Sequence, residues 1–142
     1  MKLFLQYMTR KKLLLLATTL TLLISGASPG VYAQDSTAGK TVSQKRFQRM
    51  AKKKNAVLLD VRTPGEFKEG HIPGSLQLNV QNSEEFNAGI ATLDKKKTYL
   101  LYCRSGKRSN QAKLQMKAAG FKKLFDLEGG FSQWQGAKAI QR

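Results

Sequence analysis

Short apolar runs alternate with segments of helical spacing along most of the chain after residue 41. Runs of the buried-strand type and one alternating segment predict strands near 55–62, 76–80, 97–103 and 122–130. Apolar residues at helical spacing predict helices over 42–54, 83–93, 107–120 and 130–137, with one further turn at Glu66–Lys68. Strands that alternate with helices predict an α/β domain whose parallel sheet carries helices on both faces.

Residue types at the ends of these segments support the predicted helices. Ser43 and Ser83 precede apolar periodic segments, where a hydroxyl caps a helix N-terminus. Glu84 and Glu85 would lie in the first turn, near the positive end of the helix dipole. Gly120 is placed to end its helix, because glycine adopts the left-handed conformation found just after many helices.

The first 33 residues have the order of a signal peptide. Basic residues are followed by an apolar run over 13–25 and then by small residues ending at Ala33. An uncleaved anchor is the alternative, but the run is short for a span of about 20 residues. We therefore expect a signal peptide over 1–33, general export to the periplasm, and no stable membrane insertion after cleavage. The polar segment 34–41 would be a linker, and 42–142 a single domain.

Composition narrows the classes of partner. The 142 residues include 25 Lys and Arg against 9 Asp and Glu, and this formal charge of +16 favours anionic partners. An exported protein rarely meets nucleic acid, so we expect small anions as partners and no nucleic acid. We also expect a monomer. One cysteine and one histidine exclude an internal disulfide and are too few for the usual zinc sites. We expect no metal and no cofactor.

The single cysteine, Cys103, ends a predicted buried strand and precedes a predicted helix. Ligands collect at the carboxyl ends of strands in an open parallel sheet, where this thiol would lie. The helix N-terminus, together with Arg104, Lys107 and Arg108, would favour the thiolate, which is the nucleophile. Gly106 would let several N–H groups converge on one point. The alternative is a cysteine that only fills space at a strand end.

Three motifs resemble those of the rhodanese family of sulfurtransferases: LLDVRTPGEFKEGHIPGS, YCRSGKRS and LEGGFSQW. They occur in the family's order over about residues 42–137. The small size and the leader resemble the exported single-domain members of that family. The resemblance implies a rhodanese-like three-layer domain, with a central parallel β-sheet flanked by helices on both faces.

The resemblance also implies a thiosulfate sulfurtransferase. Cys103 would take the outer sulfur of thiosulfate as a persulfide and release sulfite, and a nucleophilic acceptor such as cyanide or a thiol would remove that sulfur. The residues expected to bind the anionic donor are Arg104, Ser105, Gly106, Lys107, Arg108 and Ser109. Arg104 or Arg108 would contact the anion or hold the loop closed. Lys107 would act as a point charge near the entrance.

Three further residues are expected to support the site. Asp60 and Arg62 end the first buried strand, at the same edge as the cysteine. Asp60 would tune the potential there or cap the strand, and Arg62 would pair with Glu66. His71 would fix the GHIPG turn, the alternative being a base for Cys103.

Two rival functions stay open. Some cysteine phosphatases share this fold, but their loops hold one residue more between Cys and Arg than the four that separate Cys103 from Arg108. A non-catalytic anion-binding module or a sulfur carrier is the rival from another class. The retained cysteine favours catalysis.

Overall fold

The computed structural model describes residues 39–140. The predicted signal peptide and residues 34–38 of the predicted linker lie outside the described residues. Five strands form one parallel sheet in the order β1-β5-β4-β2-β3. They are β1 (Lys40–Val42), β2 (Ala56–Asp60), β3 (Leu76–Gln77), β4 (Thr98–Tyr102) and β5 (Lys123–Leu127). The helices are α2 (Gln44–Ala51), α3 (Pro64–Glu69), α4 (Ser83–Ala91), α5 (Lys107–Ala118) and the 3₁₀ turn η1 (Phe131–Gln133).

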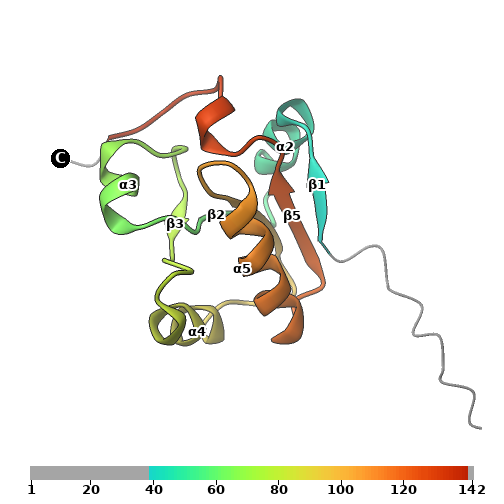
Figure 1. Ribbon diagram of the computed structural model, residues 1–142. Helices are drawn as coiled ribbons and strands as arrows, with labels where there is room; N and C mark the ends of the chain where they lie inside the picture. The colour runs from blue at the N-terminus through green and yellow to red at the C-terminus, as the bar shows by residue number, and fades with distance from the viewer. Residues whose placement is uncertain (1–38, 141–142) are drawn as a thin grey trace, which may run out of the picture. The chain divides into compact units, whose positions relative to one another are not determined.

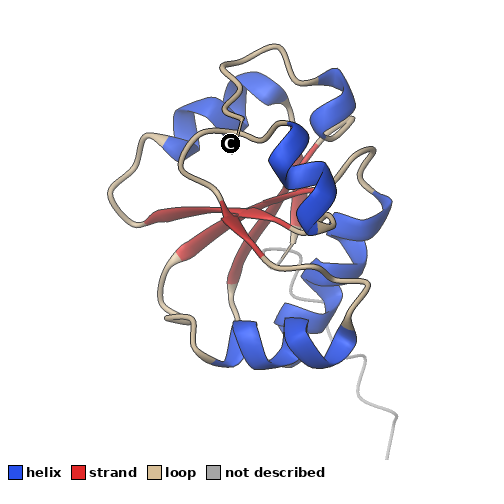
Figure 2. Ribbon diagram, turned by 90° about the vertical axis from the view of Figure 1, so that its left-hand side faces the viewer, coloured by secondary structure: helices blue, strands red, loops and turns tan. Residues whose placement is uncertain are grey.

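Helices cover both faces of the sheet, as Figures 1 and 2 show. Alternate residues of β4 enter two cores, because side chains of a strand point to opposite faces. Tyr99 and Leu101 pack in the core that α4 and α5 cover, whereas Leu100 and Tyr102 pack with Phe47 of α2 in the other. The predicted three-layer α/β architecture is confirmed.

Strand β1 corrects the predicted linker. Lys40 and Thr41 were assigned to the linker 34–41, but they pair with Phe125 and Asp126 of β5. This edge strand has only three residues, of which Val42 alone is buried. Such a short segment has no periodicity by which the sequence could reveal it.

Other boundaries also differ from the prediction. Strand β3 keeps only two of the five residues predicted over 76–80. Helix α3 is longer than the predicted single turn, because Pro64 starts it and Thr63 and Glu66 form a capping box. Helix α4 is capped by Asn82, whose side chain accepts from the Glu85 N–H, so Ser83 is not the cap.

The carboxyl ends of β2 and β4 lie side by side. Asp60 is the register partner of Tyr102, and the Val61 N–H donates to the Tyr102 carbonyl at 3.0 Å. The segments after the two strands, which begin with Val61 and Cys103, therefore leave the sheet together. Chemistry-bearing residues far apart in the sequence meet at this edge.

Candidate active site

Cys103 lies directly after β4 and is 1% exposed. The chain then turns through Gly106, whose φ of 104° is in the left-handed region, and enters α5 at Lys107. This turn directs the Gly106 N–H at the sulfur, with a distance of 3.1 Å between N and Sγ. Glycine suits the position because other residues rarely adopt such a φ. The predicted cradle at the helix N-terminus is therefore present around the sulfur.

The side chain of Ser109 also lies at the sulfur. It is fully buried, with its Oγ 3.6 Å from Sγ, and its hydroxyl donates to the Gly106 carbonyl at 2.9 Å. A thiol can donate to this oxygen. A thiolate only accepts, so the Ser109 hydroxyl can turn its single proton to the sulfur once the thiol has ionised.

The loop lowers the pKa of Cys103. Burial alone raises the pKa of the thiol. Hydrogen bonds from the N–H and hydroxyl of Ser109 oppose burial, and so do the N–H groups of Ser105 and Gly106. The balance places the pKa below the ordinary value of a cysteine. Among the effects that lower it, these hydrogen bonds are the largest.

Backbone N–H groups of the LEGGFSQW motif form hydrogen bonds with the cysteine loop. The Phe131 N–H donates to the Cys103 carbonyl at 2.8 Å, and the Ser132 N–H donates to the Arg104 carbonyl at 2.9 Å. A Cβ on Gly130 would lie 2.6 Å from the Cys103 oxygen and 2.5 Å from the Arg104 oxygen. Only glycine allows this approach. Sequence analysis recognised the motif but missed this role, for which the Gly-Gly pair was the available signal.

Arg108 is tied to α3. Its Nη1 donates to Glu66 Oε2 at 2.6 Å, and its Nη2 donates to Oε1 at 2.7 Å. Arg108 Nη1 also donates to Gln81 Oε1 at 3.2 Å. The Arg108 guanidinium lowers the pKa of Glu66 to about 2, with smaller help from Thr63 against the effect of burial. Arg108 thus holds the start of α5 against α3, a role that the sequence analysis did not assign to it.

Arg62 does not pair with Glu66 as expected. It is 4% exposed, and its Nη2 donates to Asp60 Oδ2 at 2.5 Å and to the Gly70 carbonyl at 2.7 Å. The expectation is wrong because Thr63, an extended residue, separates Arg62 from α3, so no helical turn brings Glu66 to it. The Arg62 guanidinium carbon lies 4.2 Å from the centre of the Phe131 ring. Asp60 thus orients Arg62, and Arg62 packs against the ring of Phe131. The N–H of Phe131 in turn donates to the Cys103 carbonyl.

His71 contacts α3 and the C-terminal segment. Its Nδ1–H donates to the Phe67 carbonyl at 2.9 Å, since a carbonyl only accepts, and its ring stacks on Phe67. Its backbone forms a bridge with Ala139. In residues 39–140 the imidazole makes no hydrogen bond with Cys103. These contacts place His71 in the turn and do not make it a base for the thiol.

Tyr102 anchors the same turn, a role that the sequence did not reveal. The Ile72 N–H donates to the Tyr102 hydroxyl at 3.1 Å, and that hydroxyl donates to Ser75 Oγ at 3.0 Å. Burial of the ring raises the pKa of Tyr102, so it stays a neutral donor.

Arg104, Ser105 and Lys107 are exposed. Arg104 lines a hollow of about 530 Å³ together with Phe131 and Lys138. The Lys138 ammonium lies 5.2 Å from the centre of the Phe131 ring. Lys107 is the first residue of α5 and does not line this hollow. Lys138 was not among the predicted site residues, because nothing in the local sequence separates it from other surface lysines.

Residues 39–140 contain neither a candidate metal site nor a candidate membrane span. No group of three or more His, Cys, Asp or Glu side chains there is placed to hold a metal ion. No helix of this part of the chain is long and apolar enough to cross a membrane.

Comparison with known proteins agrees with this geometry. The Rhodanese-like domain family matches residues 43–137. A protein of Allochromatium vinosum named sulfurtransferase is 34% identical over 92 residues, which are 65% of this chain and 83% of the relative. The thiosulfate sulfurtransferase GlpE of Coxiella burnetii is 31% identical over 96 residues, 68% of this chain and 87% of the relative.

A solved structure has the same fold. The rhodanese-related protein of Thermoplasma volcanium superposes with a TM-score of 0.62 at 24% identity, covering 72% of this chain and 99% of that one. The chain belongs to the Rhodanese-like domain family.

Proposed function

We propose that the protein is a sulfurtransferase that moves the outer sulfur of thiosulfate, through a persulfide on Cys103, to cyanide or a thiol. The observation that carries the proposal is the placement of Cys103 Sγ at the N-terminus of α5, 3.1 Å from the Gly106 N–H. The lowered pKa of this thiol supports a thiolate nucleophile. The names of the two curated relatives support the same class of activity.

The first half-reaction would transfer one sulfur atom. The Cys103 thiolate attacks the outer sulfur of thiosulfate, an S–S bond forms, and the S–S bond of thiosulfate breaks. Sulfite leaves with the bonding electron pair, so the new persulfide carries one negative charge. The converging N–H groups that favour the thiolate also suit this persulfide anion, which lies one atom further out.

The second half-reaction would remove the transferred sulfur and regenerate the Cys103 thiolate. Cyanide attacks the outer sulfur of the persulfide, forms thiocyanate, and leaves the Cys103 thiolate. A thiol acceptor, as its thiolate, would instead carry the sulfur away as its own persulfide. The exposed positive charge of Arg104, the residue that directly follows Cys103, suits an anionic donor.

Access to the sulfur sets a condition on this reaction. Cys103 is 1% exposed, so thiosulfate reaches Sγ only when side chains at the loop shift. Arg104 is suited to such a shift, because it is exposed and makes no side-chain hydrogen bond or ion pair within residues 39–140. Arg108 is not, since both of its terminal nitrogens are held by Glu66.

Thiocyanate formation from thiosulfate and cyanide tests the proposal. The wild-type protein should form thiocyanate catalytically, and Cys103→Ser should form none above the uncatalysed rate. Ser83→Ala is the control for substitution as such, because Ser83 is exposed at the start of α4 and its side chain does not cap that helix. Equal activity in the wild-type and Cys103→Ser proteins would contradict the proposal.

We also propose that the protein is exported and cut after Ala33, on the order of basic, apolar and small residues in 1–33. N-terminal sequencing of the protein from the periplasmic fraction tests this. Gln34 as the first residue is expected, and an intact Met1 on membrane-bound protein would contradict it.

A further inference from the structure

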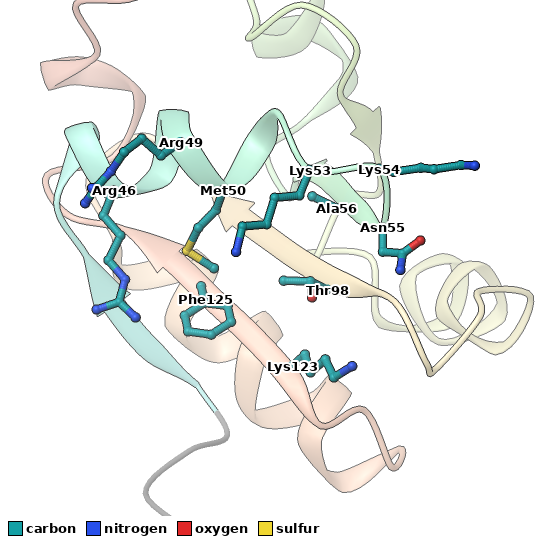
Figure 3. Close-up of a pocket in the computed structure, with 10 residues that line it drawn as sticks. All are labelled: Arg46, Arg49, Met50, Lys53, Lys54, Asn55, Ala56, Thr98, Lys123 and Phe125. Carbon is teal, nitrogen blue, oxygen red and sulfur yellow. The ribbon is translucent and has the colours of Figure 1, made fainter.

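A second hollow, of about 690 Å³, lies near the amino ends of the strands, whereas Cys103 lies at the carboxyl end of β4 (Figure 3). Three of the four strand residues that line it, Ala56, Thr98 and Lys123, each begin a strand. The two hollows share no lining residue. This hollow therefore does not belong to the candidate active site.

The floor of the hollow is apolar. Met50, Ala56 and Phe125 are half-buried and pack against the core beneath α2. Figure 3 shows the Met50 side chain reaching down from α2 toward the Phe125 ring. The floor is uncovered because α2 has only eight residues and ends at Ala51, so it is about 12 Å long and covers only part of this sheet face.

The rim of the hollow is cationic. Five exposed basic residues line it and no acidic residue does: Arg46, Arg49, Lys53, Lys54 and Lys123. None of the five takes part in the three ion pairs of residues 39–140. The one hydrogen bond that the Lys123 ammonium makes there is long, 3.5 Å to the Lys96 carbonyl. Lys53 points into the hollow, whereas Lys54 points away (Figure 3).

We propose that this hollow binds a small organic anion with a flat apolar body. The body would lie on Met50 and Phe125, and the anionic group would face Lys53 and Lys123. The volume falls within the range of about 300–1,000 Å³ that small-molecule sites occupy. The positive charges of the rim have no acidic residue beside them in the lining, and they surround an apolar floor. A ligand with an apolar surface and a negative charge complements both.

The shape and charge of the hollow argue against other occupants. A duplex or a membrane surface would meet the exposed cations but would leave the recessed floor unfilled. The leader of this chain carries Lys2, Arg10, Lys11 and Lys12 in its first 12 residues, and these would be repelled by the rim.

The methionine residues of the chain offer a direct test. The full chain, labelled with ¹³C at the methionine methyl groups, would be titrated with naphthalene-2-sulfonate and observed by NMR. Met50 lines the hollow, and Met116 is fully buried in the core under α5 on the other face. Met1 and Met8 report on the predicted leader. The Met50 signal should shift and saturate, while the Met116 signal should stay in place.

Two control ligands separate the parts of the proposal. Naphthalene-2-sulfonamide has nearly the same shape without the charge, and sulfate has charge without the apolar body. Each should need at least about tenfold higher concentration than the sulfonate to shift Met50, which is about 1.4 kcal/mol of binding free energy. A Met50 shift that is as strong with the sulfonamide, or shifts confined to Met1 and Met8, would overturn the proposal.

A pair of double variants controls for bulk charge. Lys53→Glu with Lys123→Glu should weaken sulfonate binding about tenfold or more. Lys52→Glu with Lys122→Glu makes the same change in net charge at neighbouring exposed residues that do not line the hollow. This control should bind nearly as the wild type does, and an unchanged Met116 signal would show that both variants fold. Equal loss in the two double variants would overturn the proposal.

Discussion

Arg108 at the start of α5 binds the carboxylate of Glu66 on α3 through two hydrogen bonds, although the two residues are 42 positions apart in the sequence. The side chains are 21% and 27% exposed, so water only partly screens this pair. The pair connects the loop that carries Cys103 with the segment that follows β2.

Glu66→Gln should lower the free energy of unfolding by about 1 kcal/mol at pH 7, a value near the upper end for exposed ion pairs. Glutamine can still serve the capping box with Thr63, so the loss reports the charge of the pair together with one of the two hydrogen bonds from Arg108. The pKa of Glu66 is lowered from 4.5 to about 2 in the folded protein. The stability that the ionised Glu66 carboxylate contributes to folding is therefore fully present above about pH 4.5 and is lost as the pH falls toward 2. Urea unfolding at several pH values would show this, and a difference that stays constant down to pH 2 would contradict it.

Cys103 should react with iodoacetamide along a curve whose inflection lies below the ordinary cysteine pKa of about 8.5. Ser109→Ala should raise the inflection, because the thiolate loses the hydroxyl that can donate to it. Ser105→Ala should leave it unchanged, since only the backbone N–H of Ser105 acts on the sulfur. Alkylation rates measured against pH would compare the three proteins. Equal inflections for the two variants would remove Ser109 from this role.

Gly130→Ala should displace the cysteine loop. A Cβ there would meet the backbone oxygens of Cys103 and Arg104, and its φ of 61° with ψ of −164° is essentially restricted to glycine. Gly74→Ala is the control, because its φ is also positive, at 79°, but nothing lies within 4 Å of the added Cβ. Both variants should lose about 1–3 kcal/mol of stability to backbone strain. Only Gly130→Ala should also change the alkylation rate of Cys103 in the folded protein.

Lys107→Ala should raise KM for thiosulfate a few-fold and leave kcat nearly unchanged. Lys107 is exposed at the first position of α5, so it attracts the dianion equally in the ground state and the transition state. The effect should shrink at high salt, because exposed charges are screened over about 8 Å at physiological ionic strength. Lys117→Ala, in the last turn of the same helix, is the control. Steady-state kinetics at two salt concentrations would show whether Lys107 instead affects kcat.

The sequence predicted local structure better than long-range pairing. Strands β2 and β4 were predictable because their apolar runs are continuous, as in strands whose residues are mostly buried or half-buried on both faces. The turn at Gly106 and the lowered pKa of Cys103 followed from one short segment. The pairing of Arg108 with Glu66 depends on where separate segments meet, and side-chain spacing along the chain carries no such information. The pairing of Arg62 with Asp60 is local, because side chains two residues apart in an extended segment lie on the same side, and the sequence analysis assigned Arg62 the wrong neighbour. Strand β1 was missed because pairing with β5 stabilises it, not its own pattern.

The central claim is that Cys103 accepts sulfur from thiosulfate, and intact-protein mass spectrometry tests it most directly. After incubation with thiosulfate and removal of small molecules, the wild-type protein should gain the mass of one sulfur atom. Cyanide should remove that mass, and peptide mapping should locate it on Cys103. Cys103→Ser should gain nothing. A wild-type protein that stays at its original mass with thiosulfate, while its cysteine still alkylates as a thiolate, would contradict the proposed reaction.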